Sequence, residues 1–296
     1  MQMHNPYADA KGEWIRGSFH GHCGEHSLCS TVPLDVSAKW YHDVGARFMT
    51  VTDHDHVTDV EALERTYPDM VFLRGFEFSS DRNLLFIGRT VPPLYEMPLA
   101  DAFRQAGDLL TIVCHPQPRP PEYYWPIPAI LALSRTPHGV EIYNGHYGTD
   151  RMRDLGHQPC FTGVWDELLT LGQRIWGFAN DDFHDPDDFD NAFNMVLVPE
   201  VSADAILDAA KHGRCYGSTG LLLESVEIGG RRIRVRTAER CRGRFVGPRG
   251  QVLKETEATE FVYIATDEAY IRFEGEGKTG RLFLQPMFQG TGCGRC

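Results

Sequence analysis

Seven histidine, aspartate and glutamate side chains of the kind that binds metal ions lie at or just beyond the ends of short apolar runs. Imidazole nitrogens together with carboxylate oxygens suit Zn, Mn or Fe better than Ca, which prefers all-oxygen sites. A shared carboxylate can hold two such metal ions side by side, and two metal ions held in this way lower the pKa of bound water. The seven residues are His20, His22, His54, Glu77, His115, Asp182 and His184.

The spacing of these residues favours joint binding. His20 and His22 are separated by one residue, as are Asp182 and His184. In an extended chain, side chains at positions i and i+2 lie on the same face. Glu77 follows the apolar run VFLRGF, where an unpaired carboxylate would be costly and a cation would stabilise it. Each residue alone has an ordinary interpretation as a surface charge or a core histidine; together they predict one metal centre.

The elements that must position these ligands are short strands. Apolar runs of about four to eight residues, bounded by Gly, Pro, Asn or Asp, predict buried strands. Segments of helical period lie between them, and most end at a glycine, as helices commonly do. This alternation, through about residue 217, predicts a parallel sheet whose strands deliver the ligands to one edge. The expected strands are 14–19, 47–52, 71–75, 109–114, 140–143 and 174–179, and the expected helical segments end at Gly45, Gly107, Leu133, Gly172 and Gly213.

The character of the chain changes from about residue 218. Apolar residues alternate on both sides of Gly229-Gly230, from Val226 to Val235, and predict a hairpin. No helical period follows. We therefore expect two parts: residues 1–217, which carry the metal ligands, and residues 218–296, a small antiparallel β module. Further short strands are expected at 261–265, 270–273 and 281–284.

Composition and charge restrict the class of protein. The 296 residues are 42% hydrophobic and 11% aromatic, which is typical of a globular protein. A formal net charge of -12 argues against nucleic acid as a high-affinity partner, because phosphate contacts need clustered Lys and Arg. No stretch approaches the roughly 20 apolar residues that span a bilayer, and the first residues lack the apolar segment of a secretory signal. A cytoplasmic protein without a membrane partner is expected, and the pattern gives no indication of its oligomeric state.

The eight cysteines are scattered without the spacing of a disulfide framework. In a chain without a secretory signal, free thiols are expected. Cys293 and Cys296 form a CxxC pair on the last residues. Because no earlier cysteine pair stands at zinc-ribbon spacing, we interpret this pair as part of a frayed tail, with a redox or zinc role as the alternative.

Six motifs give the chain a resemblance to the PHP (polymerase and histidinol phosphatase) family of metal-dependent phosphoesterases. They occur in the family's order across residues 14–190. The resemblance implies a distorted (β/α)7 barrel with two or three divalent ions (Zn, Mn or Fe) at the carboxyl ends of its strands. Residues 213–220 and the β module resemble a subgroup that includes carbamate-cleaving enzymes. The motifs are Phe19-His20-Gly-His22, Thr52-Asp53-His54-Asp55, Gly75-Phe-Glu77, Cys114-His115-Pro116, Glu141-Ile-Tyr-Asn144 and Asp182-Phe-His184.

The family's pattern, carried over to this sequence, assigns the ligands to individual ions. Four residues would bind one ion, and Glu77 among them would bridge to a second ion held by His115. His54 and His184 would reach a third ion or complete the second, and we count Glu141 among the ligands as well. The four residues of the first ion are His20, His22, Glu77 and Asp182.

Two motifs depart from the family's pattern. The first commonly continues into Ser-Asp-Gly, whereas here it continues as Cys-Gly-Glu-His, so Glu25 or His26 would substitute as a ligand. A histidine that is common after the glutamate motif is absent. Arg82 stands in that segment as a candidate partner for a phosphate or carboxylate of the substrate; its alternative is a solvated surface arginine. We also expect Asn144 to bind substrate.

The chemistry that these residues predict is hydrolysis. A metal-bound hydroxide would attack a phosphorus or acyl centre of a small, anionic substrate. Asp53 would orient a neighbouring ligand, and His184 or His26 would protonate the leaving group. A phosphoesterase is the first hypothesis. A carboxylic-ester, carbamate or amide hydrolase is the second, and a metal-containing binding protein without activity is the third.

Overall fold

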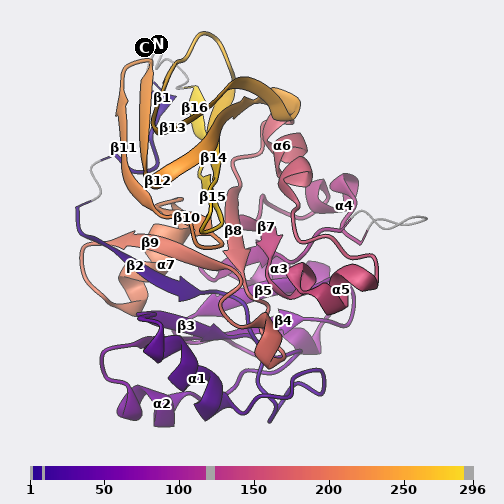
Figure 1. The fold of residues 1–296 in the computed structure, drawn as a ribbon. Coiled ribbons are helices and arrows are strands. Elements are labelled where there is room, and N and C mark those ends of the chain that lie inside the picture. The colour runs from indigo at the N-terminus through magenta and orange to yellow at the C-terminus, as the bar shows by residue number, and fades with distance from the viewer. Residues whose placement is uncertain (1–2, 9–10, 118–123, 290–296) are drawn as a thin grey trace.

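The chain has a mixed α/β fold built around a large sheet (Figure 1). The computed structural model describes residues 3–8, 11–117 and 124–289. All six strands expected before residue 217 are present, within a few residues of their expected ends, and three further strands accompany them. The nine are β2 (Glu13–Ser18), β3 (Phe48–Val51), β4 (Val71–Phe78), β5 (Leu84–Gly88), β6 (Leu110–Val113), β7 (Gly139–Asn144), β8 (Trp176–Asn180), β9 (Phe193–Val198) and β10 (Cys215–Ser218).

The alternation of strands and helices predicted a parallel sheet. The observed sheet is rich in parallel pairs but not wholly parallel. Strands β2, β3 and β4 are parallel neighbours, and so are β6, β7 and β8. Strand β5 lies antiparallel between β4 and β6, and β9 lies antiparallel beside β2. The link from β4 to β5 is only a few residues long, and such a short link joins antiparallel strands because a parallel crossover needs a dozen residues or more.

Strands β2 and β8 approach each other beyond their carboxyl ends. The strand order runs β10-β9-β2-β3-β4-β5-β6-β7-β8. Among the described residues, β8 and β2 share no ladder, but a single parallel bridge joins Gly21 to Phe183, and the His22 N–H donates to the Phe183 carbonyl at 2.9 Å. The segments after β2 and β8 therefore lie side by side at the edge where the predicted ligands are found.

The helices surround the sheet where the sequence pattern predicted them, and two short ones were not predicted. Helices α1 and α2 lie at the bottom of Figure 1, farthest from the C-terminal strands at the top. Helix α7 has the expected glycine at its end, since Gly213 beyond it has φ +71°, and at its start the Ser202 hydroxyl accepts a hydrogen bond from the Ala205 N–H. The helices are α1 (Leu34–Asp43), α2 (Glu61–Thr66), α3 (Leu99–Gln105), α4 (Ile127–Leu131), α5 (Asp150–Asp154), α6 (Thr162–Thr170) and α7 (Ala203–Lys211), of which α2 and α5 were not predicted.

The C-terminal strands are antiparallel, as expected, and continue the main sheet. Strand β15 pairs with β10, which in turn pairs with β9. The predicted hairpin is formed by β11 and β12, but its turn is one residue later than expected, because Gly229 pairs with Arg232. The boundary at 217/218 remains a prediction. The strands are β11 (Leu223–Gly229), β12 (Arg232–Gly247), β13 (Gln251–Ile264), β14 (Tyr270–Glu276), β15 (Arg281–Leu284) and β16 (Met287–Gln289), and β1 (Met3–His4) pairs with β16.

The buried core of residues 1–217, called the main part below, extends into the C-terminal strands through Tyr270, Phe283 and Phe288. The largest hydrophobic cluster packs the strands β4 to β8 against α3, α6 and α7, and a second fills the space beneath β11 to β16. All six described cysteines are free thiols, as predicted, while the Cys293/Cys296 pair lies outside the described residues. Within the described part of the chain, no helix has the length and apolar character needed to cross a membrane.

Candidate metal centre

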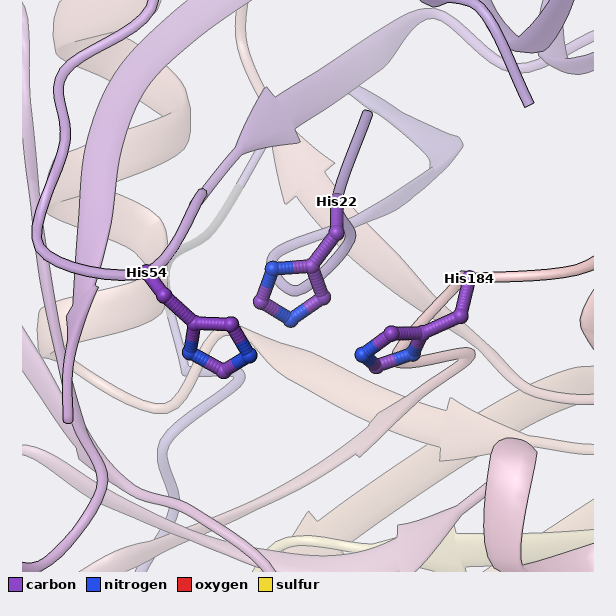
Figure 2. A group of neighbouring side chains, drawn as sticks. All are labelled: His22, His54 and His184. Carbon is purple, nitrogen blue, oxygen red and sulfur yellow. The ribbon is translucent and has the colours of Figure 1, made fainter. Parts of the chain in front are cut away.

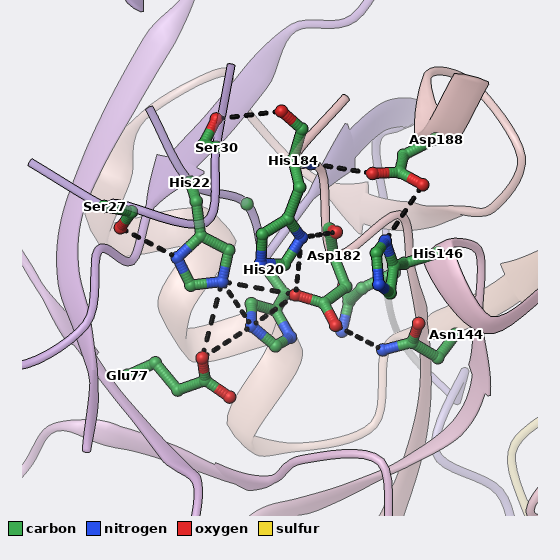
Figure 3. Close-up of polar contacts among 12 residues, drawn as sticks. His20, His22, Ser27, Ser30, Glu77, Asn144, His146, Asp182, His184 and Asp188 are labelled. Carbon is green, nitrogen blue, oxygen red and sulfur yellow. Dashed lines mark hydrogen bonds and ion pairs between the residues drawn. The ribbon is translucent and has the colours of Figure 1, made fainter. Parts of the chain in front are cut away.

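The predicted ligands come together at one edge of the sheet, delivered by five different strands. Figure 3 labels His20, His22, Glu77, Asp182 and His184 among them. Most follow their strand directly. Glu77 is an exception, because β4 is longer than expected and contains it. A parallel bridge between His54 and Glu77 extends the β3–β4 pairing to this point. The ligand positions are His20 and His22 after β2, His54 after β3, Glu77 in β4, His115 after β6, and Asp182 and His184 after β8.

Four of these side chains form a cage of the size that a divalent ion requires. His20 Nε2 lies 3.3 Å from His22 Nε2 and 3.0 Å from Asp182 Oδ1. His22 Nε2 lies 3.2 Å from the same oxygen, and Glu77 Oε2 lies 3.5 Å and 3.4 Å from the two imidazole nitrogens. Donor atoms about 3.3 Å apart can each lie about 2.0 Å from a shared ion, which is a typical Zn–N or Zn–O bond length. These five separations are therefore suited to a shared divalent ion.

Glu77 faces two groups of donors with its two oxygens. Oε2 lies 3.0 Å from His54 Nδ1 in addition to its contacts with His20 and His22. Oε1 lies 3.2 Å from His115 Nε2. The carboxylate is 1% exposed and contacts four imidazoles. This arrangement suits a carboxylate shared between two ions.

A second group of donors, the histidine cluster, consists of His22, His54 and His184 (Figure 2). The His54 and His184 rings have centroids 4.4 Å and 4.3 Å from the His22 ring and 6.3 Å from each other. One nitrogen of each residue lies within 4.8 Å of one nitrogen of the other two. Because an imidazole nitrogen has one lone pair, His22 would serve either this cluster or the four-donor cage, and His54 and His184 offer a further place for an ion.

The charges in the centre favour ionised carboxylates. Burial alone would raise the pKa of Glu77, but His20 and the other imidazoles around it outweigh burial and lower the pKa well below its usual range. Asp182 behaves in the same way, with burial opposed by His20 and His184. Burial and the neighbouring His22 lower the pKa of His184 to about 4, so this imidazole is neutral near pH 7. Burial alone would lower the pKa of His20 and His115, but Asp182, Glu141 and Glu77 raise it, so a metal ion would displace a proton from each of these two rings.

Hydrogen bonds behind the cage hold His22 in place. The Ser27 hydroxyl donates to Asp53 Oδ1 at 2.6 Å and lies 3.3 Å from His22 Nδ1. Asp53 is fully buried, and its other partners are the Cys23 N–H and thiol and the Thr58 hydroxyl. Asp53 thus reaches His22 through Ser27, as expected for a residue that orients a ligand, and it does not line the cavity.

A cavity of about 260 Å³ opens beside the centre. Its wall away from the ligands is made of amide, imidazole and phenol side chains. The His115 ring stacks on Tyr124 and meets Tyr147 edge-on, with centroids 5.5 Å and 5.3 Å apart. The lining residues are His54, Glu77, Asn83, His115, Gln117, Tyr124, His146, Tyr147, Asp182 and His184.

Among the predicted site residues outside the cage, His26, Arg82 and Asn144, like Asp53, do not line this cavity. His26 is exposed and stacks on His56, with centroids 4.1 Å apart. Arg82 donates through Nε to the Tyr124 carbonyl at 3.1 Å and lies over the Trp125 ring, so it supports the cavity wall from behind. Asn144 is buried behind Asp182.

Glu141, the remaining predicted ligand, does not line the cavity either. It lies behind His20, and the two are joined at 2.8 Å through His20 Nδ1, the nitrogen on the opposite side of the ring from the four-donor cage.

His146 is the histidine of the cavity wall that the sequence analysis missed. Its Nδ1 lies 3.0 Å from Asp188 Oδ1, and its ring packs against His184 at 4.7 Å. Asp188 is fully buried and also accepts the backbone N–H of His184. His146 follows β7 by two residues, so the rule that found the other ligands, a donor just beyond a strand, would have found it too.

The comparisons with known proteins agree with this architecture. No family model matches the sequence, and neither does any curated protein. The fold is similar to that of a solved two-domain protein from Bacteroides vulgatus that contains a predicted PHP-like metal-dependent phosphoesterase. The TM-score is 0.56, and the alignment covers 96% of this chain and 98% of that chain at 17% sequence identity. At this identity the similarity shows that the two proteins share a fold over almost their whole length.

Proposed function

We propose that this protein is a metal-dependent phosphoesterase. The observation that carries the proposal is the cage formed by His20, His22, Glu77 and Asp182, whose donor atoms are spaced for one divalent ion, with His115 on the other oxygen of Glu77. The similar fold of a protein that contains a predicted PHP-like metal-dependent phosphoesterase supports it. We likewise propose that the sheet forms the distorted (β/α)7 barrel that the motifs imply.

The residues of this chain would divide the work as follows. Two or three divalent ions held by the cage, His115 and the histidine cluster would supply an activated water and positive charge that stabilises the transition state. Glu77 would keep two ions close together, and Asp53 would fix His22 through Ser27. His146, held by Asp188 and lining the cavity, would contact the leaving group. We propose this role for His146 in place of His184, which belongs to the histidine cluster, and of His26, which lies outside the cavity.

A carboxylic-ester or carbamate hydrolase is the second candidate, and the composition of the cavity wall favours it. Among the described lining residues, none is lysine or arginine. A phosphomonoester carries up to two negative charges, and cationic side chains usually help to bind it. The neutral wall formed by Asn83, Gln117, Tyr124 and Tyr147 suits an uncharged ester or an aryl group.

Metal removal tests the proposal and separates the candidates. We expect chelator-treated protein to hydrolyse nothing, and addition of Mn, Zn or Fe to restore hydrolysis of 4-nitrophenyl phosphate. The measurement is steady-state hydrolysis alongside metal content, with 1-naphthyl acetate and a naphthyl carbamate as parallel substrates. Hydrolysis of the acetate or carbamate without the phosphate would favour the second candidate. Protein that retains metal and hydrolyses none of the three would be a binding protein.

A further inference from the structure

Glu141 is a carboxylate beside the metal centre that accepts four hydrogen bonds. It lies in the middle of β7 between β6 and β8 and is 0% exposed. Oε1 accepts from His20 Nδ1 at 2.8 Å and from Asn180 Nδ2 at 2.9 Å. Oε2 accepts from the His115 backbone N–H at 2.8 Å and from Asn144 Nδ2 at 3.2 Å. A carboxylate has about four lone-pair positions, so a metal ion could bind it only by displacing one of these donors.

The contact with His20 fixes which nitrogen of that ring is available to a metal. An ionised carboxylate only accepts hydrogen bonds, so Nδ1 of His20 must carry the hydrogen. Nε2 then presents its lone pair on the other side of the ring, where it lies 3.0 Å from Asp182 Oδ1 and 3.3 Å from His22 Nε2. Glu141 thereby selects the tautomer that the four-donor cage needs.

The contact with His115 acts on the backbone instead. His115 has φ +25°, in the region that residues with a side chain rarely adopt, and strain of this kind persists only where other contacts hold it. The hydrogen bond from its N–H to Glu141 Oε2 is such a contact. It sets the direction in which the His115 ring leaves β6 towards Glu77 Oε1.

Asn144 extends the same network to a third ligand. Its Nδ2 donates to Glu141 Oε2 and also to Asp182 Oδ2 at 3.0 Å (Figure 3). Asp182 too has a positive φ, +52°. One buried carboxylate and its amide neighbour therefore contact residues on both sides of Glu77: His20 and Asp182 in the cage, and His115 beyond it.

We propose that Glu141 is not a metal ligand but the positioning residue that couples the two metal subsites, by orienting His20 in one and His115 in the other. The inference rests on the proposed metal centre. It replaces the assignment of Glu141 as a ligand that the motif suggested, and it turns Asn144 from a substrate-binding residue into part of the same support.

Glu141→Gln tests the proposal because it keeps the size of the side chain. A glutamine can accept at only one of its two ends, so at least two of the four donors lose their partner. We expect metal affinity to fall by about 10- to 100-fold at both subsites, with the full number of ions still bound at saturating metal. The measurement is a titration with Co²⁺ in competition with a chelator, followed by absorption, with metal content determined at saturation. Neither readout depends on catalytic activity.

A matched control separates positioning from a merely structural role. Glu274 is also a buried carboxylate with charged partners, but it lies in the C-terminal strands. Glu274→Gln should lower thermal stability and leave Co²⁺ affinity unchanged. If Glu141→Gln does not fold, Asn144→Ala replaces it, with weaker affinity expected mainly at the subsite that contains Asp182.

Two results would overturn the proposal while leaving the metal centre intact. Loss of one whole ion from Glu141→Gln at saturation would make Glu141 a ligand. Unchanged affinity at both subsites would leave it with no positioning role. Wild-type protein that binds no divalent ion at all would instead refute the proposed function, and this result is visible before any variant is made.

Discussion

Glu77→Gln is expected to lower kcat/KM by about 10³-fold or more, which corresponds to roughly 4 kcal/mol of lost transition-state stabilisation. The two oxygens of Glu77 face different partners: Oε2 lies 3.0 Å from His54, and Oε1 lies 3.2 Å from His115. Glutamine offers one oxygen and no charge, so it cannot serve both sides. We therefore expect loss of at least one ion together with the loss of rate.

The measurement for this variant combines metal content with steady-state kinetics on whichever substrate the wild-type protein accepts. Glu64→Gln is the matched control, because Glu64 pairs at the surface with Arg74, which is on the same strand as Glu77. We expect the control to retain both metal and rate. A Glu77→Gln protein that keeps its full metal content and more than a tenth of its rate would contradict the bridging role.

The positions and the common direction of the six predicted strands were readable from the sequence, while β5, β9 and β10, which bring antiparallel pairs into the sheet, were not. Short apolar runs gave the strands near Val71 and Leu110 correctly. The run 84–88 was overlooked as a strand, although it is fully buried as β5. Helix α3 connects β5 to β6, yet the two strands are antiparallel. Alternation of strand and helix therefore did not determine direction here, because direction depends on whether the connection carries the chain back to the end of the sheet where the previous strand began.

The candidate site shows a similar limit at the level of single side chains. The sequence brought the right types of donor to the right edge of the sheet, and seven of them lie around one centre. It could not show on which side of a ring a carboxylate would lie, so Glu141 and Glu77 looked alike. Their difference arises from partners on other strands: Asn180 on β8 and the His115 backbone for Glu141, but four imidazole rings for Glu77.

Loop residues were the hardest to place. His26 lies in the segment between β2 and α1, which has no regular structure of its own. The direction of that segment is fixed by distant contacts, such as the Gly24 N–H donating to the Val32 carbonyl and the Cys23 N–H donating to Asp53. Nothing in the local sequence indicates that these contacts turn His26 outwards towards His56.

The interface between the main part and the C-terminal strands contains a buried network of charged side chains, which the sequence also did not reveal. Arg272 on β14 binds Asp166 on α6 with two hydrogen bonds of 2.7 Å, and it donates to Glu274 at 2.6 Å. Tyr270 and Arg244 complete the group. The side chains of Arg272, Asp166 and Glu274 are each at most 7% exposed. The network thus links a helix of the main part to the C-terminal strands through charges that are almost fully removed from water.

Arg272→Met is expected to lower the free energy of unfolding by about 3–5 kcal/mol, because it leaves Asp166 and Glu274 buried without their shared cation. Arg242→Met is the matched control: Arg242 pairs with Glu276 on the same strands but at the surface, so its loss should cost about 1 kcal/mol or less. Urea unfolding, followed by both tryptophan fluorescence and circular dichroism, measures the difference. Because the network spans the 217/218 boundary, we expect the two signals to shift together. Separate transitions in wild-type protein would mean that the C-terminal strands unfold on their own, and a shift no larger than that of Arg242→Met would mean that the buried charges are already solvated.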